Sequence, residues 1–146
     1  MIRNILLLLY VLTLLKIAAE DFRYHKIRNK EVVKIVCLAI AGMFLVPEIS
    51  VSSRLMGMFV VSLPMFVIDW IRPGSFGGGD LKLTFACGAF LGEQKLIFGT
   101  IAGIFFVGIF AICVLCRKKR KNTRFALGPC LALGYVLSTF CIIFKK

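Results

Sequence analysis

The chain has 146 residues, 60% of them hydrophobic, and a mean hydropathy of +0.92, which exceeds what the core of a soluble domain of this size requires. These values exclude a soluble globular protein and predict one transmembrane domain over residues 1–146, with no length left for a separate soluble domain. The net charge of +12 does not indicate nucleic-acid binding, because the basic residues lie between apolar segments, where they meet anionic lipid headgroups.

Hydropathy predicts an all-α bundle of about six transmembrane helices, at residues 4–20, 32–47, 51–71, 80–92, 96–116 and 125–144. The first apolar run is followed by charged residues instead of a cleavage site, so we interpret it as a retained helix and not as a signal peptide. Pro64 is expected to kink the third helix. The fourth segment, LKLTFACGAFLG, has only about twelve residues, so it either crosses as a short helix or re-enters the membrane.

The positions of Lys and Arg decide between these two alternatives for the fourth segment. If all six segments cross, twelve of the basic residues fall on one side, and five, among them Arg54, fall on the other. Because basic residues accumulate on the cytosolic side, this distribution predicts six crossings. It also predicts that both chain termini lie outside the cytosol and that the loops at 21–31, 72–80 and 117–124 lie within it.

Two of the seven acidic residues stand out, because Asp21 ends the first helix and Asp80 begins the fourth on the same predicted side. Asp80 alone is compatible with a helix N-cap. The preceding Gly77, Gly78 and Gly79 have no Cβ atoms and favour positive φ, so we expect a loop against which an extended substrate lies. If the two carboxylates converge, their repulsion keeps one of them protonated near neutral pH, which is how aspartic proteases activate water.

Other polar residues receive structural interpretations. Asp69 is expected to form a salt bridge with Arg72, one helical turn away. The six cysteines lie in apolar runs, and Cys113 and Cys116 have CxxC spacing without a second such pair, so we expect neither disulfides nor a metal site. His25, the single histidine, is expected to be solvated. The sequence therefore predicts no metal and no other cofactor.

The segments FGGGDLKL, EDFRYHKIRN and ALGPCLALGY occur in the chain together with the two aspartates. All three resemble segments of the type IV prepilin peptidases, a family of intramembrane aspartyl proteases. FGGGDLKL (76–83) resembles the family's GxGD motif, EDFRYHKIRN (20–29) resembles its other aspartate segment, and ALGPCLALGY (126–135) is similar to its Phe-Gly-Pro-x-Leu-Ala-Leu-Gly segment. Arg28 stands where the family usually has proline, which leaves the shape of that loop in question. A tetracysteine domain associated with N-methylation has no counterpart in this sequence, so the chain resembles the minimal, peptidase-only members. We interpret GPCLALG as a helix packed through small residues and not as catalytic.

The resemblance implies a membrane aspartyl endopeptidase, without cofactor, in a prokaryotic plasma membrane. It implies that Asp21 and Asp80 are catalytic, and that the substrates are prepilin- or pseudopilin-like proteins. Cleavage would follow a glycine, between a short basic leader and a hydrophobic helix, on the cytosolic side. Two alternatives remain: a non-catalytic small transporter or assembly subunit whose carboxylates form an ion site, and a related aspartyl protease that cuts another secreted peptide.

Overall fold

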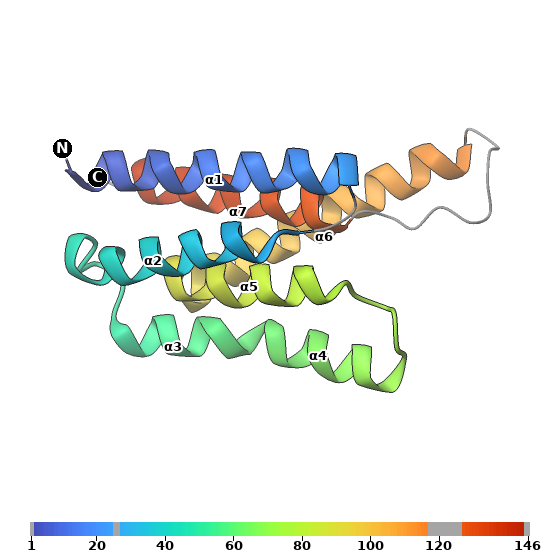
Figure 1. Cartoon of the computed structure of the whole chain (residues 1–146), viewed down its shortest axis with the longest axis horizontal. Helices are drawn as coiled ribbons and strands as arrows, with labels where there is room; N and C mark the ends of the chain where they lie inside the picture. The colour runs from blue at the N-terminus through green and yellow to red at the C-terminus, as the bar shows by residue number, and fades with distance from the viewer. Residues whose placement is uncertain (1, 25–26, 117–126, 145–146) are drawn as a thin grey trace.

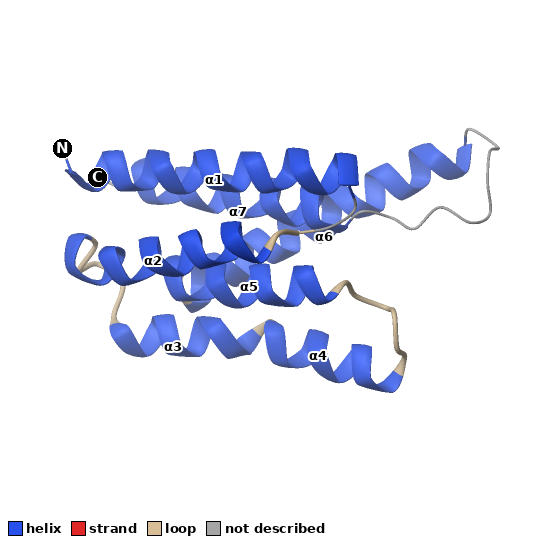
Figure 2. Cartoon of the chain, viewed as in Figure 1, coloured by secondary structure: helices blue, strands red, loops and turns tan. Residues whose placement is uncertain are grey.

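The structure, a computed structural model, describes residues 2–24, 27–116 and 127–144. His25 and the basic run at 117–124 lie outside the described residues, as do the side chains of Cys113 and Cys116. Within the described ranges all regular secondary structure is helical (Figure 2). The helices are α1 (Ile2–Tyr24), α2 (Asn29–Leu45), α3 (Val51–Val60), α4 (Ser62–Ile71), α5 (Gly78–Leu91), α6 (Glu93–Cys116) and α7 (Leu127–Phe144).

The predicted helical membrane bundle is confirmed, with α3 and α4 together forming the third predicted segment. Val61 interrupts this segment, because Pro64 has no N–H with which to bond the carbonyl of Val60. Among the residues that the structure describes, three helical stretches are long and apolar enough to cross a membrane: residues 2–24, 51–71 and 93–110. The remaining helices, α2, α5 and α7, each lie close to a predicted segment.

The short helix α5 lies between α2 and the α3–α4 pair (Figure 1). Its 14 residues span about 21 Å, less than the roughly 30 Å of a bilayer core. Most of its side chains are buried, so neighbouring helices and not lipid surround it. A Cβ on Gly57 of α3 would lie only 2.8 Å from the carbonyl oxygen of Gly88 on α5, so the two backbones touch where both helices have glycine.

Arg54 of α3 is 3% exposed and hydrogen-bonds to α2 and α5 at the end of the bundle where α5 ends. Its guanidinium donates to the carbonyl oxygens of Gly42 (3.0 Å) and Val46 (3.1 Å) at the end of α2, and of Ala89 (3.1 Å) and Phe90 (3.0 Å) in α5. These carbonyls lie at the negative ends of the two helix dipoles, where a cation is stabilising. The charge distribution predicts that Arg54 is an external charge, whereas in the structure it is a buried helix residue.

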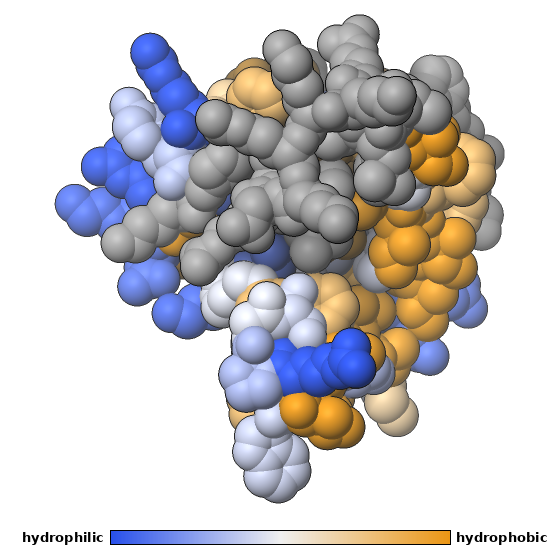
Figure 3. All heavy atoms as spheres, turned by 90° about the vertical axis from the view of Figure 1, so that its right-hand side faces the viewer, coloured by the Kyte–Doolittle hydropathy of each residue, from blue (hydrophilic) through white to orange (hydrophobic). Residues whose placement is uncertain are grey.

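α1 packs against α7, and α7 packs against α6 (Figure 1). α1 ends, α4 ends and α5 begins at the same end of the bundle, opposite to the one where the chain starts. Figure 3 looks onto this end, where hydrophilic residues gather beside an apolar flank. Asp21 and Asp80 both belong to helix turns at this end.

Candidate active site

Asp21 lies in the last two turns of α1, with its side chain 6% exposed. Leu14, Ile17 and Asp21 follow one another at spacings of three and four residues, so they share the inward face of the helix. Glu20 lies about 100° around the helix and is 3.6 Å from Arg28. The helical register therefore directs one carboxylate of this adjacent pair into the bundle.

Arg28 keeps a conformation that proline also adopts. Its φ of −76° and ψ of 130° are extended, and this φ lies within the range that a proline ring imposes. α2 begins immediately afterwards, at Asn29. The loop after α1 therefore has a proline-like backbone at the position where the resemblance led us to expect proline.

Asp80 is the third residue of α5 and is 8% exposed. The N-cap is Gly77, whose backbone hydrogen-bonds the Asp80 carboxylate, as the third-residue carboxylate does in a capping box. The interpretation of Asp80 as the N-cap residue is therefore wrong, because Gly77 holds that position. The Asp80 carboxylate nevertheless stabilises the N-terminus of α5 through its hydrogen bond to the Gly77 backbone.

The three glycines differ from the predicted substrate loop, because Gly78 and Gly79 belong to the first turn of α5. Positive φ occurs nearby at Gly74 (88°) and not at these three positions. A Cβ on Gly79 would lie 2.9 Å from the Cβ of Ile27, so this glycine lets the start of α5 approach the segment that follows α1. A Cβ on Gly78 would have no neighbour within 4 Å. Gly79 thus brings the segment after α1 close to the start of α5.

The structure brings Asp21 and Asp80 together beside Gly128, in the first turn of α7. A Cβ built on Gly128 would lie 2.9 Å from the Cγ of Asp21 and 3.1 Å from the Oδ1 of Asp80, so these two atoms are at most about 6 Å apart, the sum of the two lengths. The charges of the two carboxylates interact. A pair at this spacing can contact one water molecule from both sides, since hydrogen bonds between oxygens measure about 2.8 Å.

A buried polar cluster holds α5 against α7 below the carboxylates. The Tyr135 hydroxyl of α7 lies 3.1 Å from the Thr84 hydroxyl of α5 and 3.4 Å from the Thr100 hydroxyl of α6. Thr84 is one turn from Asp80, and Tyr135 is two turns from Gly128. These hydrogen bonds therefore set the depth of α7 relative to α5 near the site.

Asp69 holds the turn that leads into α5, although not through the predicted salt bridge with Arg72. Its Oδ1 accepts hydrogen bonds from the backbone N–H groups of Gly74 (3.1 Å) and Phe76 (3.2 Å). The backbone turns back at Gly74, where the positive φ favours glycine. This turn brings two backbone donors to the carboxylate, while Arg72 follows the end of α4.

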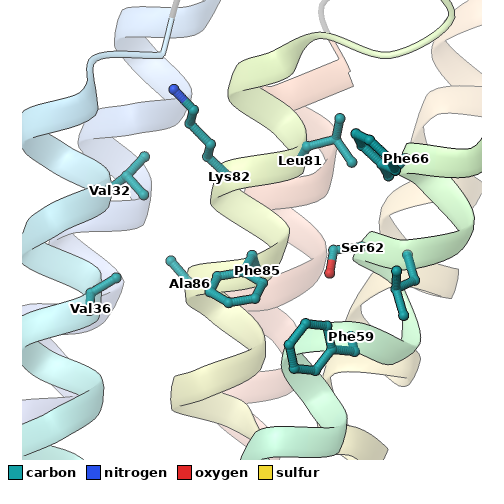
Figure 4. A pocket seen from close by; sticks show the side chains of 10 residues that line it. Val32, Val36, Phe59, Ser62, Phe66, Leu81, Lys82, Phe85 and Ala86 are labelled. Atoms are coloured by element: carbon teal, nitrogen blue, oxygen red, sulfur yellow. The ribbon is translucent and has the colours of Figure 1, made fainter. Parts of the chain in front are cut away.

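An apolar groove lies on the other face of α5 (Figure 4). Its volume is about 350 Å³, and it is lined by Val32, Val36, Phe59, Ser62, Leu63, Phe66, Leu81, Lys82, Phe85 and Ala86. Leu81, Lys82 and Phe85 lie 100–200° around the helix from Asp80. The groove therefore faces away from the carboxylates and is not part of their site.

Three residues of this site were not predicted from the sequence to belong to it: Gly128, Thr84 and Tyr135. Thr84 shares a helical face with Asp80, and Tyr135 shares one with Gly128. This spacing identifies them as site residues only once α5 and α7 are known to be neighbours. Within the described ranges, no three His, Cys, Asp or Glu side chains are grouped so that they could hold a metal ion. Cys37, Cys87 and Cys130 are free thiols.

Comparison with known proteins relates this arrangement to a peptidase family. A sequence model of the type IV leader peptidase family matches residues 7–112, which include both aspartates. The chain is 25% identical over 130 residues to the prepilin leader peptidase/N-methyltransferase of Bacillus subtilis (strain 168), covering 88% of this chain. The chain spans about half of that relative, 52% of its length. No solved structure gives a significant match.

Proposed function

The chain belongs to the type IV leader peptidase family, and we propose that it is an aspartyl endopeptidase that removes the short basic leader of prepilin- or pseudopilin-like proteins. The observation that carries the proposal is the convergence of two buried carboxylates, from α1 and α5, beside a glycine of α7. Asp21 and Asp80 are the catalytic pair in this proposal. The relative from Bacillus subtilis supports a prepilin-type substrate.

The proposed chemistry needs one proton shared between the two carboxyl groups. The ionised carboxylate takes a proton from a water molecule, whose oxygen attacks the scissile carbonyl carbon, while the protonated partner donates its proton to the carbonyl oxygen. As the resulting gem-diol collapses, the ionised carboxylate takes a proton from one hydroxyl group, the C–N bond breaks, and the leaving nitrogen receives the proton of the other carboxyl group. The two groups titrate as a coupled pair, so the proton belongs to the pair and not to one named residue.

The depth of the pair suits a substrate that is itself a membrane helix. Backbone groups of a helix in lipid are hydrogen-bonded internally, so a protease can reach a peptide bond only where the helix is unwound, near the membrane surface. Asp21 lies near the end of α1 and Asp80 at the start of α5, at one end of the bundle. We propose that this end faces the cytosol of a prokaryotic cell, in accord with the distribution of basic residues, and that both termini lie outside.

The test is co-expression with candidate prepilin-like proteins, followed by N-terminal sequencing of the products. We expect cleavage after a glycine, and loss of all cleavage in Asp21→Asn and in Asp80→Asn, with unchanged membrane insertion. Glu48→Gln is the control, because Glu48 is half-exposed and pairs with Arg3 at 2.6 Å. Full cleavage by the Asp80→Asn protein would refute the aspartyl mechanism. Cleavage of a different secreted peptide, with prepilins left intact, would instead favour the related-protease alternative.

A further inference from the structure

We propose that Gly128 is a positioning residue for the carboxylate pair: its missing side chain leaves free the space that Asp21 and Asp80 share. This inference rests on the proposed peptidase function. It assigns a role in the site to a segment, GPCLALG, that the sequence analysis interpreted as helix packing alone. The role is to keep the two carboxyl groups close, with room between them.

The atoms around Gly128 carry this inference. The three heavy atoms nearest to a Cβ at this position are the Oδ2 and Cγ of Asp21 and the Oδ1 of Asp80. All three belong to the ends of carboxylate side chains, and none belongs to a backbone. A methyl group at residue 128 would therefore displace the two carboxyl groups while the helices keep their places.

Gly134, six residues further along the same helix, provides the contrast. A Cβ at Gly134 would lie 2.6 Å from the backbone nitrogen and 2.9 Å from the Cα of Gly103 on α6. A methyl group there meets a helix backbone, which cannot move without separating α6 from α7. The packing interpretation of GPCLALG therefore holds for Gly134, whereas Gly128 faces the carboxylates.

The neighbouring contacts explain why a carboxylate, and not α7, would move. α7 is held at fixed depth by the hydrogen bond between Tyr135 and Thr84, and by its close contact with α6 at Gly134. The carboxyl group of Asp21 ends a side chain with two rotatable bonds, so it is the softer partner. Alanine at 128 should therefore change the relation of the two carboxyl groups before it changes the fold.

The expected kinetic effect is on the chemical step. A displacement of about 1 Å in a reacting group can lower a rate about 100-fold, so we expect kcat of Gly128→Ala to fall by about that factor. KM should stay within about threefold, because binding of the substrate segment does not depend on the separation of the carboxyl groups. The pH–rate profile should narrow, because the gap between the two apparent pKa values of a coupled pair shrinks when the groups move apart.

The experiment compares three alanine variants in the full chain in detergent micelles: Gly128→Ala, Gly134→Ala and Gly108→Ala. Gly108 of α6 is exposed, and a Cβ there has no neighbour within 4 Å, so this variant is the matched control, with unchanged kcat. Its melting temperature should be equal to or slightly above that of the unmodified protein, because alanine favours a helix more than glycine does. Gly134→Ala should lower the melting temperature. Gly128→Ala should melt as the unmodified protein does and lose kcat, with a narrower pH profile.

Two outcomes would refute the positioning role and leave the proposed peptidase function intact. One is an unchanged kcat and pH profile in Gly128→Ala. The other is a fall in the melting temperature of Gly128→Ala as large as that of Gly134→Ala. If the unmodified protein cleaves no prepilin-like substrate, the proposed function fails instead. In that case the proximity of residues 21 and 80 is tested by the yield of a disulfide or short crosslink between the two thiols of the Asp21→Cys/Asp80→Cys protein. Gly128→Ala should lower the crosslinking yield, and an equal yield with and without it would refute the inference.

Discussion

Replacement of Arg54 by methionine should destabilise the fold strongly and leave the carboxylate pair in place. The guanidinium donates to four carbonyl oxygens at the end of the bundle opposite to Asp21 and Asp80. Methionine keeps much of the side-chain length and removes every donor. The variant therefore isolates the contribution of these hydrogen bonds to stability.

The loss of unfolding free energy in Arg54→Met depends on which of the four carbonyl oxygens still accept a hydrogen bond from another donor. Gly42 still accepts from the Val46 N–H at 2.9 Å, and Val46 from the Ile49 N–H at 3.4 Å. Ala89 is different, because the Glu93 N–H, four residues on, is directed to the Ser53 hydroxyl at 3.2 Å. We therefore assign the loss to the two carbonyls of the last turn of α5, at about 1–3 kcal/mol each, or about 2–6 kcal/mol together. Relief from burying the guanidinium favours the lower part of this range.

The assay is reversible unfolding in mixed micelles, with the free energy of unfolding compared between Arg54→Met and a surface control. Arg3→Met is that control, because Arg3 pairs with Glu48 at 2.6 Å on an exposed surface, where ion pairs contribute about 0–1 kcal/mol. A loss below about 1 kcal/mol in Arg54→Met would refute the view that this arginine caps α2 and α5. Equal losses in the two variants would refute it as well.

Three further predictions concern the site and its orientation. Tyr135→Phe removes the hydroxyl that is hydrogen-bonded to Thr84 and Thr100, so it should lower the free energy of unfolding by about 1–2 kcal/mol and lower kcat several-fold. Unchanged values of both would contradict the view that these hydrogen bonds set the depth of α7 relative to α5. Chelators should leave cleavage unchanged, and strict zinc dependence would exclude the proposed carboxylate mechanism. In a protein without its native cysteines, the Asn122→Cys thiol should be labelled only from the cytosolic side and a cysteine added after Lys146 only from outside, whereas labelling of both from one side would rule out six crossings.

Hydropathy located the helices to within a few residues because it measures the free energy of moving each segment into a bilayer. The expected segment at 51–71 and the observed α3–α4 pair share the same bounds. The short fourth segment was also expected, and charge distribution favoured a crossing helix. Such patterns report depth along the membrane normal, and so they placed Asp21 and Asp80 at matched depth. They carry no information on which helices are neighbours.

Residues whose role depends on neighbours were accordingly misread. Arg54 was counted as an external charge, because its acceptors are backbone carbonyls, which any sequence supplies at a helix end. Asp69 was paired with the nearest basic residue, whereas the turn at Gly74 brings backbone donors to it. Gly77 to Gly79 were expected to provide positive φ, but Gly79 instead provides close approach to Ile27. The partners of Arg54 and Asp69 are backbone groups, and the partner of Gly79 is a side chain from another segment, so the residue types alone do not identify any of these contacts.

The effect of replacing a glycine in this bundle depends on which atoms surround it. Gly57 and Gly88 face each other's backbones, so their small size sets the distance between α3 and α5. Gly128 has the same missing atom, but its neighbours are two carboxyl groups whose charges interact. Substitution at the first kind of position separates helices, and substitution at the second separates functional groups within an intact bundle. The physical difference is whether the displaced atoms belong to a rigid backbone or to the end of a side chain, and melting temperature and kcat measure these two consequences separately.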